Sequence, residues 1–569
     1  MGPDDARLVS QRQPRRRFSP DRTTRGVWLQ VGDLRGPLLG LQALDQGNSV
    51  NLSAIDIAII GIYAVSIFIL AQWVSREKGT HQKDAQDYFL AGRALPWWAI
   101  GTSLIAANIS AEQIIGMSGS GYAIGLAIAS YEWMPAITLI IVGKYFLPIF
   151  LTNGIYTMPE FLERRYSTSV RTVMAIFWLG VYIFVNLTAI LWLGATAVHT
   201  VAGVNVQAAL VALGVFAGAY ALYGGLKAVA LTDIVQVSLL VLGGFIITYI
   251  ALNKISGGAG IIAGFHDLTM RFPDKFKLIL PRDNPYYKDL PGLSVLLGGL
   301  WVMHISYWGF NQYIIQRALG AKNIREAQKG IVLAAFLKLL MPVIIVLPGI
   351  AAAALAPNLD RPDEAYPHLM AMLPKGIMGL VFAALIAAIV ASMGSKINSI
   401  ATIFTMDVYR PLRPNASQSH LVLVGRITAV VALTVAIIMA KPLLGSFDQA
   451  FQYIQEFTGF FTPGICVIFL LGMFWPRCTA TGALAAAIGS AVLSFVFKLA
   501  WPSLPFLDRV GLVFLACLGI AIVLSLMQPR ADSAVRVELK KIDYSTSTGF
   551  NVAALAVTAI LLGLYAFWW

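Results

Sequence analysis

The chain has 569 residues, of which 57% are hydrophobic and only 12% are charged. This composition excludes a soluble globular protein, and successive apolar runs of about 20 residues indicate a polytopic helical membrane protein. The formal net charge of +13 does not indicate a nucleic-acid partner, because Lys and Arg lie mostly in short loops, as membrane topology requires. The three cysteines and six histidines show no metal-ligand or disulfide spacing. Since the sequence also contains no Walker A, G-x-S-x-G or H-E-x-x-H motif, we do not expect an enzyme.

Residues 1–50 differ from the rest of the chain. They include eight arginines and no apolar run long enough for a signal peptide. We interpret this segment as a disordered basic tail without a role in function, of the kind that an early assignment of the translation start would add. The transmembrane domain is expected to occupy residues 51–569.

From Ser53 onward, the apolar runs predict about 14 membrane-spanning helices. They lie near residues 53–75, 98–121, 125–150, 173–198, 206–223, 229–253, 291–316, 327–355, 376–407, 421–440, 449–474, 479–500, 510–528 and 550–569.

Basic residues gather in loops that fall on one side of the membrane if the spans alternate. These loops are 76–96, 151–172, 317–327, 408–420 and 529–549. The positive-inside rule places them in the cytoplasm and both termini on the opposite side. Two longer loops on that opposite side, 254–290 and 356–375, are candidates for external caps.

The predicted span near 98–121 begins as an apolar helix and is then interrupted by polar residues. Asn108, Ser110, Glu112 and Gln113 fall within six residues. A carboxylate and two carboxamides at membrane depth are costly unless they face protein or a water-filled cavity. We therefore predict a helix break near residues 107–110 that frees backbone carbonyls for a cation and helix ends for a polar solute. The alternative is that these side chains only hydrogen-bond to neighbouring helices.

A second interruption lies in the span near 291–316, five spans after the first. Small and polar residues cluster there: Gly298, Gly299, His304, Ser306, Tyr307, Gly309, Asn311 and Gln312. Two interrupted helices at corresponding positions are typical of an inverted repeat of five helices plus five, with a binding site at the membrane midplane.

Several long segments resemble signatures of the sodium:solute symporter family, most closely its sodium/galactose (sodium/glucose) type. They are SLIAANISAEQ (103–113), GLAIASYEWM (125–134), GKYFLPIF (143–150), YALYGGLKAVALTDIVQ (220–236), GLWVMHISYWGFNQYIIQR (299–317), FAALIAAIVASMGSKINSIATIFTMDVY (382–409) and FQYIQEFTG (451–459). The resemblance implies an all-α fold of the leucine-transporter type, with a 5+5 inverted-repeat core, one helix before it and three after it. It also implies alternating-access symport of Na+ with a sugar through the inner (plasma) membrane.

The resemblance further implies a sugar site whose residue types suit the task. Carboxylate, ammonium and carboxamide groups together satisfy sugar hydroxyls, and an aromatic face covers the C–H surface of the ring. The implied residues are Gln113, Glu132, Lys338 and Gln455, with Asn108 of the first break and the aromatic pair Tyr307 and Trp308. Two positions depart from the sodium/galactose type. Pro135 replaces a serine and His304 replaces an asparagine, so galactose itself does not follow from the resemblance.

The implied sodium site consists of backbone oxygens and hydroxyls, which a hard monovalent cation prefers. The matching positions are Ala106, Ile109, Ala388, Ala391 and Ser392. Ala391 departs from the pattern, because it replaces a second serine and so removes one hydroxyl. Asp233 matches an acidic residue expected on the path of sodium release.

Each of these interpretations has an alternative. Glu132 and Lys338 could form a structural ion pair, His304 could be an interhelical hydrogen-bonding residue, and Trp308 could serve packing. The transported solute could be another polar molecule, such as inositol, sialic acid or an amino acid. A solute sensor that does not transport is the alternative from a different class.

Overall fold

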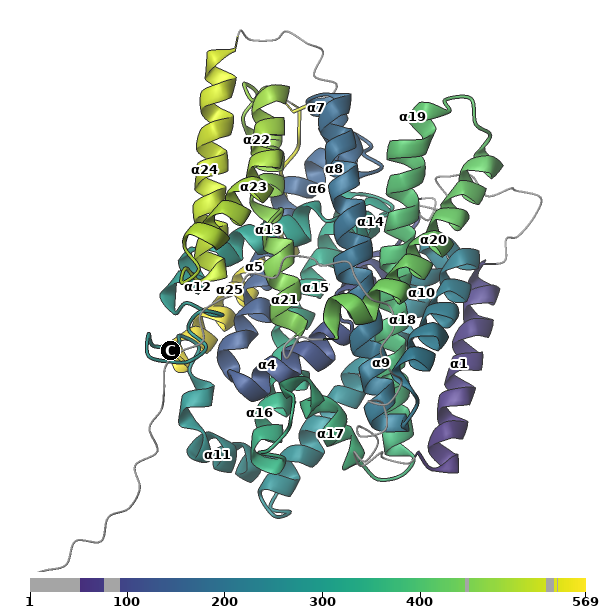
Figure 1. Cartoon of the computed structure of the whole chain (residues 1–569), viewed down its shortest axis with the longest axis vertical. Coiled ribbons are helices and arrows are strands. Elements are labelled where there is room, and N and C mark those ends of the chain that lie inside the picture. The colour runs from purple at the N-terminus through teal and green to yellow at the C-terminus, as the bar shows by residue number, and fades with distance from the viewer. Residues whose placement is uncertain (1–51, 76–92, 446–449, 529–536, 540) are drawn as a thin grey trace, which may run out of the picture. The chain divides into compact units, whose positions relative to one another are not determined.

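The computed structural model describes residues 52–75, 93–445, 450–528, 537–539 and 541–569 (Figure 1). Within these ranges, nothing is described of the side chains at 71, 72, 74, 75, 220–234, 236 and 237. The predicted tail at 1–50 and the side chain of Asp233 therefore lie outside the described part of the molecule. The described part is a bundle of helices.

The first half of the bundle starts with the interrupted helix and ends with a long one. Its elements are α3 (Trp97–Asn108), η2 (Glu112–Met117), α4 (Ser118–Ala123), η3 (Leu126–Ala129), α5 (Ser130–Ile141), η4 (Val142–Phe146), α6 (Leu147–Thr152), α7 (Met158–Arg165), α8 (Thr168–Gly180), η5 (Val181–Leu187), α9 (Thr188–Ala202) and α10 (Val206–Ile255). The spans expected at 206–223 and 229–253 are joined in one continuous helix, α10, and its apolar parts Val206–Ala219 and Ser238–Ile255 correspond to them. Glycine costs only about 1 kcal/mol in a helix interior, so the Gly224–Gly225 pair did not end the helix.

The second half follows the first external loop and contains the second interruption. Its elements are α11 (Ile261–Arg271), η6 (Pro273–Phe276), α12 (Leu293–Leu297), α13 (Gly299–Phe310), α14 (Gln312–Leu319), α15 (Ile324–Ile344), α16 (Val346–Leu355), η7 (Pro362–Glu364), α17 (Ala365–Ala371), α18 (Ile377–Ile403), η8 (Phe404–Tyr409), α19 (Arg410–Leu412), α20 (Gln418–Leu444), α21 (Ala450–Gly459) and α22 (Thr462–Phe474). The loops predicted as external caps thus contain the short helices α11 and α17.

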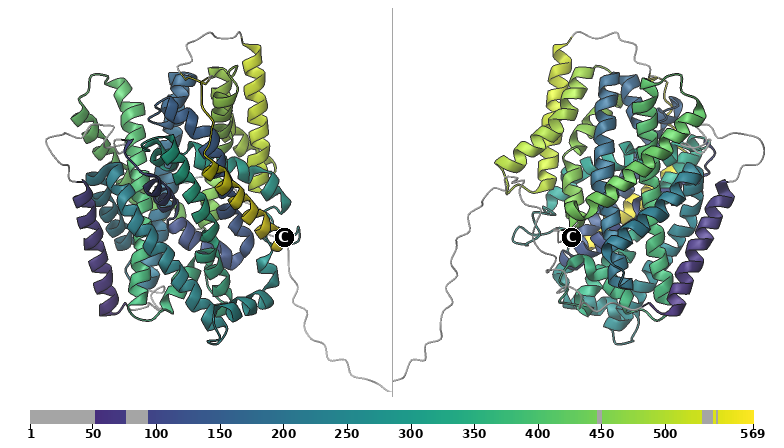
Figure 2. Two further views of the ribbon diagram at one scale, coloured as in Figure 1. Left: turned by 180° about the vertical axis from the view of Figure 1, so that it is seen from behind. Right: turned by 45° about the vertical axis from the view of Figure 1, so that its right-hand side comes forward.

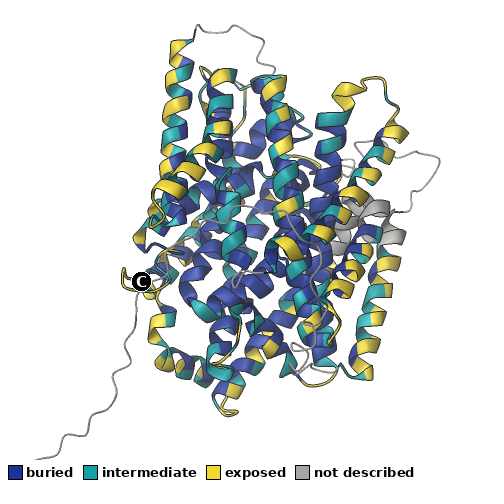
Figure 3. Ribbon diagram, in the orientation of Figure 1, coloured by how far each residue is buried: buried dark blue, intermediate teal, exposed yellow. Residues whose placement is uncertain are grey.

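The remaining helices flank this core. They are α1 (Ala54–Ser75), α23 (Ala480–Ala500), α24 (Phe506–Met527) and α25 (Thr548–Phe567). Helix α25 crosses the bundle and packs on α5 and α15 (Figure 2). Helix α18 lies inside the bundle against α1, α3, α10 and α20, and it is buried along nearly its whole length (Figure 3). The flanking helices instead turn large apolar side chains such as Leu515 and Leu555 outward, as expected for surfaces in contact with lipid.

The two ends of the described chain lie on the side of the predicted external loops. The Asp56 carboxylate at the start of α1 accepts hydrogen bonds from the backbone N–H groups of Gly376 and Gly379, both at 2.8 Å. The backbone carbonyl of Trp568, after α25, accepts from the N–H of Leu278 at 2.8 Å. Basic loop residues next to α7 and α19 lie at the opposite end of the bundle (Figure 1). This arrangement agrees with the predicted sidedness, whereas its orientation in the membrane stays a prediction.

Nine helices in the described part are long and apolar enough to cross a membrane, and the bent pair of α21 and α22, with an angle of 47°, would make ten. They confirm the prediction of a polytopic helical membrane protein, while the exact number of 14 is not confirmed. One residue that we predicted in a basic loop, Arg317, lies in helix α14 instead and is fully buried. Its guanidinium donates hydrogen bonds to the Ser103 and Ser395 hydroxyls and to the Tyr313 carbonyl.

Candidate functional site

The first predicted break is present and lies where the polar cluster begins. Helix α3 ends at Asn108, Ile109 is extended with φ −75° and ψ 113°, and η2 begins at Glu112. The Ser110 hydroxyl organises the turn, because it accepts from the Glu112 N–H at 3.2 Å and donates to Gln113 Oε1 at 3.0 Å. The break at 107–110 is therefore confirmed.

The small residues after this break serve a separate purpose. A side-chain carbon at Gly121 would meet the Val346 carbonyl oxygen at 2.8 Å, and one at Gly349 would meet the Ser118 carbonyl oxygen at 2.0 Å. These glycines therefore allow α4 and α16 to pack with their backbones in contact, as small residues commonly do between membrane helices.

The second break has nearly the same backbone. Helix α13 ends at Phe310, Asn311 is extended with φ −82° and ψ 118°, and α14 begins at Gln312. The Tyr182 hydroxyl, from η5, donates to Asn311 Oδ1 and accepts from the Gln312 N–H at 3.0 Å. The prediction of a second interruption is confirmed, and the Tyr182 side chain, from the first half of the bundle, satisfies the backbone N–H of Gln312.

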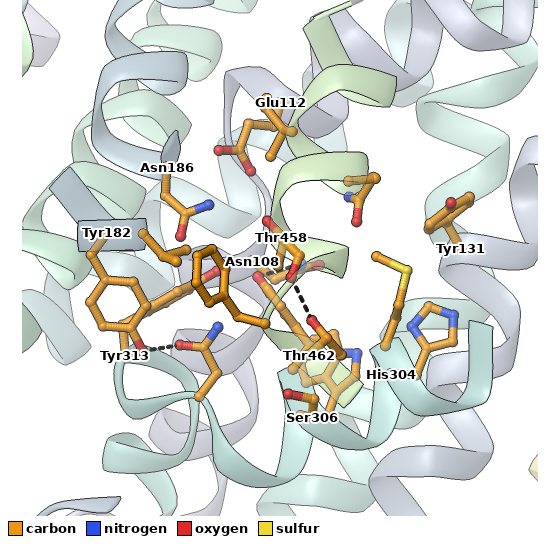
Figure 4. A pocket seen from close by; sticks show the side chains of 18 of the residues that line it. Asn108, Glu112, Tyr131, Tyr182, Asn186, His304, Ser306, Tyr313, Thr458 and Thr462 are labelled. Atoms are coloured by element: carbon orange, nitrogen blue, oxygen red, sulfur yellow. Dashed lines mark hydrogen bonds between the residues drawn. The ribbon is translucent and has the colours of Figure 1, made fainter. Parts of the chain in front are cut away.

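A cavity of about 80 Å³ lies between the two breaks (Figure 4). The polar and aromatic residues implied for the sugar site all line it: Asn108, Gln113, Glu132, His304, Tyr307, Trp308, Lys338 and Gln455. The structure therefore brings together residues from α3, η2, α5, α13, α15 and α21, which lie far apart in the sequence.

A continuous chain of polar contacts forms one wall of this cavity. The Lys338 ammonium donates to Glu132 Oε2 at 2.5 Å and to Asn108 Oδ1, and Asn108 Nδ2 donates to the Tyr307 hydroxyl at 3.0 Å. Lys338 also lies 5.1 Å from the centre of the Trp308 ring. Both charged side chains are 1% exposed, so the pair is held at low dielectric, where each charge depends on its partner.

His304 contributes an unused polar atom to the cavity. The residue is buried, its ring packs edge-on against Tyr131 at 6.0 Å, and its Nε2 atom has no hydrogen-bond partner in the described structure. A buried ring nitrogen without a partner carries a desolvation cost that a solute hydroxyl can remove. Pro135, the other departure, lies inside α5 and is buried.

The residues implied for sodium meet next to the first break. Ser392 of α18 is fully buried, and its hydroxyl donates to the Ala107 carbonyl in the last turn of α3 at 3.3 Å. Ala106, Ile109, Ala388 and Ala391 are also buried, and each lies within four residues of Ala107 or Ser392 in the sequence. The Ser392 hydroxyl thus meets a backbone oxygen of the helix end, but this oxygen belongs to Ala107 and not to Ala106 or Ile109, so the donor set implied for sodium stays a prediction.

Sequence reasoning missed several polar groups at the site. Asn186, Thr458 and Thr462 line the cavity, and so does Glu112, which the sequence indicated only as part of the first break. Lys396 of α18 is fully buried and donates to Ser392 Oγ at 3.0 Å. Lys396 carried a usable signal, because an ionisable residue inside a membrane span is by default a functional candidate.

The chain belongs to the sodium:solute symporter family, whose model matches residues 88–489. It is 50% identical over 537 residues to a sodium/glucose cotransporter of Vibrio parahaemolyticus, covering 91% of this chain and 99% of that protein. It is 32% identical to sodium/glucose cotransporter 4 of Danio rerio, covering 78% of this chain and 72% of that protein. It is also 32% identical to sodium/myo-inositol cotransporter 2 of Mus musculus, covering 78% and 69%.

Solved structures with the same fold include two other cation symporters. A Na+-coupled sialic acid symporter in a substrate-bound outward-open state aligns with a TM-score of 0.74 at 22% identity, covering 84% of this chain and 99% of that one. A transporter of the nucleobase-cation-symport-1 family aligns with a TM-score of 0.51 at 13% identity, covering 79% and 96%. The predicted fold, an all-helical symporter of the leucine-transporter type, is confirmed.

Proposed function

We propose that this protein is a secondary active transporter that moves a sugar into the cell together with Na+, by alternating access across the inner (plasma) membrane. One observation carries the proposal. A buried chain of polar contacts, from Glu132 through Lys338 and Asn108 to Tyr307, lines a cavity between two broken helices. Intramembrane charges are costly, and they are usually retained where a solute or an ion uses them.

The proposed sugar site uses the donors and acceptors of this chain. The Glu132 carboxylate accepts from sugar hydroxyls, the Lys338 ammonium donates to them, and the carboxamides of Gln113 and Gln455 do both. Tyr307 supplies an aromatic face for the C–H surface of the ring. The relatives named as sodium/glucose cotransporters support a sugar as the solute.

The proposed sodium site lies at the end of α3, against α18. Backbone oxygens of Ala106, Ile109 and Ala388 would coordinate Na+ together with the Ser392 hydroxyl, while Ala391 supplies no hydroxyl at the remaining position. Such oxygens bind a hard cation without burying a full negative charge beside it. Because one break borders both sites, a cation at α3 and a sugar at Asn108 would stabilise the same arrangement of the broken helix. Asp233 stays the candidate for the path of sodium release.

Coupling to Na+ supplies the driving force. One charge that moves down a membrane potential of 100 mV releases about 2.3 kcal/mol. At about 1.4 kcal/mol per tenfold change, this corresponds to roughly a fiftyfold sugar gradient for each Na+.

A second candidate is Na+ symport of another polar solute. The unpartnered Nε2 of His304 and the buried Pro135 favour it, because both lie where the sodium/galactose type has other residues. The similarity to a sodium/myo-inositol cotransporter makes a cyclitol the first alternative to test.

Reconstituted liposomes test both candidates. Uptake of labelled galactose, glucose, myo-inositol, sialic acid and proline is compared with an inward Na+ gradient and with K+ replacing Na+. We expect accumulation of a hexose only with Na+, increasing with an inside-negative potential. Equal accumulation in K+ without a proton gradient would contradict Na+ symport. A preference for inositol, sialic acid or proline would replace the sugar assignment.

A further inference from the structure

A second buried lysine lies directly behind the proposed sodium site. Lys396 follows Ser392 by one helical turn of α18, and both side chains are fully buried. The Lys396 ammonium donates to Ser392 Oγ at 3.0 Å and lies 4.5 Å from the centre of the Tyr313 ring. The proposed function assigns no role to this charge.

The hydroxyl of Ser392 is shared between two positions for a cation. A serine hydroxyl has one proton and two lone pairs. The proton is used by the Ala107 carbonyl, and one lone pair accepts from Lys396. A sodium ion that binds Ser392 Oγ would therefore lie a few ångström from the ammonium, where two like charges repel strongly at low dielectric.

A counter-charge for Lys396 lies on the other side of the break. Glu112 begins η2, is 6% exposed, and its Oε1 has no hydrogen-bond partner in the described structure. Figure 4 shows its carboxylate pointing into the cavity near Asn186. The Lys396 ammonium and the Glu112 carboxylate attract each other from a distance, because the two side chains do not form a direct ion pair.

The remaining charge near Lys396 is fixed in place. Arg317 repels the Lys396 ammonium, and its guanidinium is held by the hydroxyls of Ser103 and Ser395 and by the Tyr313 carbonyl. Lys396 is therefore the cation of this pair whose flexible side chain can change partners, from the Ser392 hydroxyl toward Glu112.

We propose that the Lys396 ammonium is a tethered competitor of the transported sodium ion, bound to Ser392 in the sodium-free protein and displaced toward Glu112 when Na+ binds. This inference rests on the proposed function for the location of the sodium site. The competition lowers Na+ affinity and keeps the Ser392 oxygen hydrogen-bonded after Na+ has left. Because the ammonium stays in the protein, it makes Na+ release easier. The Ser392 hydroxyl is the one hydroxyl left among the residues implied for this site, since Ala391 replaces the second serine.

Sodium binding to the purified full chain in detergent tests this proposal. NaCl is titrated against choline chloride at constant ionic strength, and the Na+-dependent rise in melting temperature gives the half-saturating Na+ concentration. Lys396→Met should lower that concentration at least tenfold, because the competing charge is gone. Lys396→Arg, which keeps the charge, should stay within about threefold of the unmodified protein, and Lys322→Met, at an exposed position, should be unchanged.

Glu112→Gln extends the test, because it removes the negative charge toward which the Lys396 ammonium is proposed to move. It should raise the half-saturating Na+ concentration, and adding Lys396→Met to it should lower the concentration again. Should Lys396→Met not give a monodisperse protein, Lys396→Gln replaces it with the same expectation. Unchanged or weaker Na+ binding after removal of the lysine charge would overturn the proposal.

Sugar uptake measured in parallel separates this inference from the proposed function. If the unmodified protein requires Na+ for uptake and Lys396→Met binds Na+ no more tightly, the inference fails and the symporter stands. If the unmodified protein takes up sugar without Na+ and Lys396→Met acquires tight Na+ binding, the Na+ coupling fails and the competition stands.

Discussion

The two helix breaks share a backbone conformation and differ in their surroundings. Ile109 and Asn311 are both single extended residues, with φ and ψ of −75° and 113° in one and −82° and 118° in the other. The second break is closed by neutral hydrogen bonds: Tyr182 bonds Asn311 and the Gln312 N–H, and Gln312 Oε1 accepts from the Met158 N–H at 2.8 Å. The first break is instead bordered by the Glu132–Lys338 pair and by Lys396.

This difference shows that an interrupted helix is not by itself a binding site. Unwinding frees the same backbone groups in both halves of an inverted repeat. At the second break the Tyr182 hydroxyl satisfies the Gln312 N–H, and we expect this break to act mainly as a structural joint, although Asn311 also lines the cavity. Where charged side chains and a hydroxyl meet at a cavity, as around Asn108 and Ser392, the break can hold a solute and a cation.

The largest expected effect comes from breaking the charge pair at the first break. Lys338→Met leaves Glu132 as an uncompensated buried charge, which costs about 3–5 kcal/mol. Sugar uptake into liposomes should fall more than 100-fold. The double variant Glu132→Gln/Lys338→Met should recover protein yield and monodispersity without recovering transport. Uptake within twofold of the unmodified protein would show that the pair only holds helices together.

At the second break, we expect an effect on stability rather than on affinity. Gln312→Met keeps the volume of a fully buried side chain and removes the acceptor of the Met158 N–H. An unsatisfied buried donor costs about 1–3 kcal/mol, so the melting temperature should fall by several degrees. Sugar affinity of the folded protein should be preserved. Loss of sugar affinity at an unchanged melting temperature would place the second break in the site.

The hydroxyl at the first break should set Na+ affinity. Ser392→Ala removes one proposed ligand, and the loss of a bond of about 1.4 kcal/mol raises the half-saturating Na+ concentration about tenfold. Ala391→Ser restores the hydroxyl of the sodium/galactose type and should lower that concentration. The two variants are compared by Na+-dependent uptake at saturating sugar. Equal Na+ dependence in both would remove the sodium site from α18.

The smallest effect is expected from a change at His304, and this effect concerns which sugar the protein prefers. His304→Asn replaces the ring nitrogen by the amide of the sodium/galactose type and should shift the ratio of galactose to glucose competition severalfold toward galactose. His199→Asn is the matched control, because His199 is exposed at the end of α9. An unchanged ratio in both variants would leave His304 with a structural role only.

The sequence predicted the breaks because their cause is local. A carboxylate and two carboxamides inside an apolar run are incompatible with a lipid-facing helix, so the interruption near Ile109 followed from residue types alone. The residues implied for the sugar site came from matching motifs, and the structure brings all of these to one cavity, together with Asn186, Thr458 and Thr462, which were not predicted. Their roles in binding stay predictions.

What the sequence did not reveal depends on tertiary contacts. The sequence predicts Arg317 in a basic loop, whereas the structure shows its guanidinium hydrogen-bonded to the hydroxyls of Ser103 and Ser395. The spans predicted at 206–223 and 229–253 imply an interruption between them, yet the helix continues through Gly224 and Gly225. Lys396 lies in the matching motif at 382–409, for which the resemblance implied a role for Ser392 but none for the lysine one helical turn later.

Mutual dependence of sugar and Na+ binding tests the central claim, that both bind at the first break, most directly. Sugar affinity is measured with and without Na+, and Na+ affinity with and without sugar, on the purified protein. Thermodynamic linkage requires each ligand to tighten the other by the same factor, and we expect that factor to be at least fivefold. It should shrink in Ser392→Ala and persist in Gln312→Met. Sugar binding that is the same with Na+ and with K+ would contradict the account.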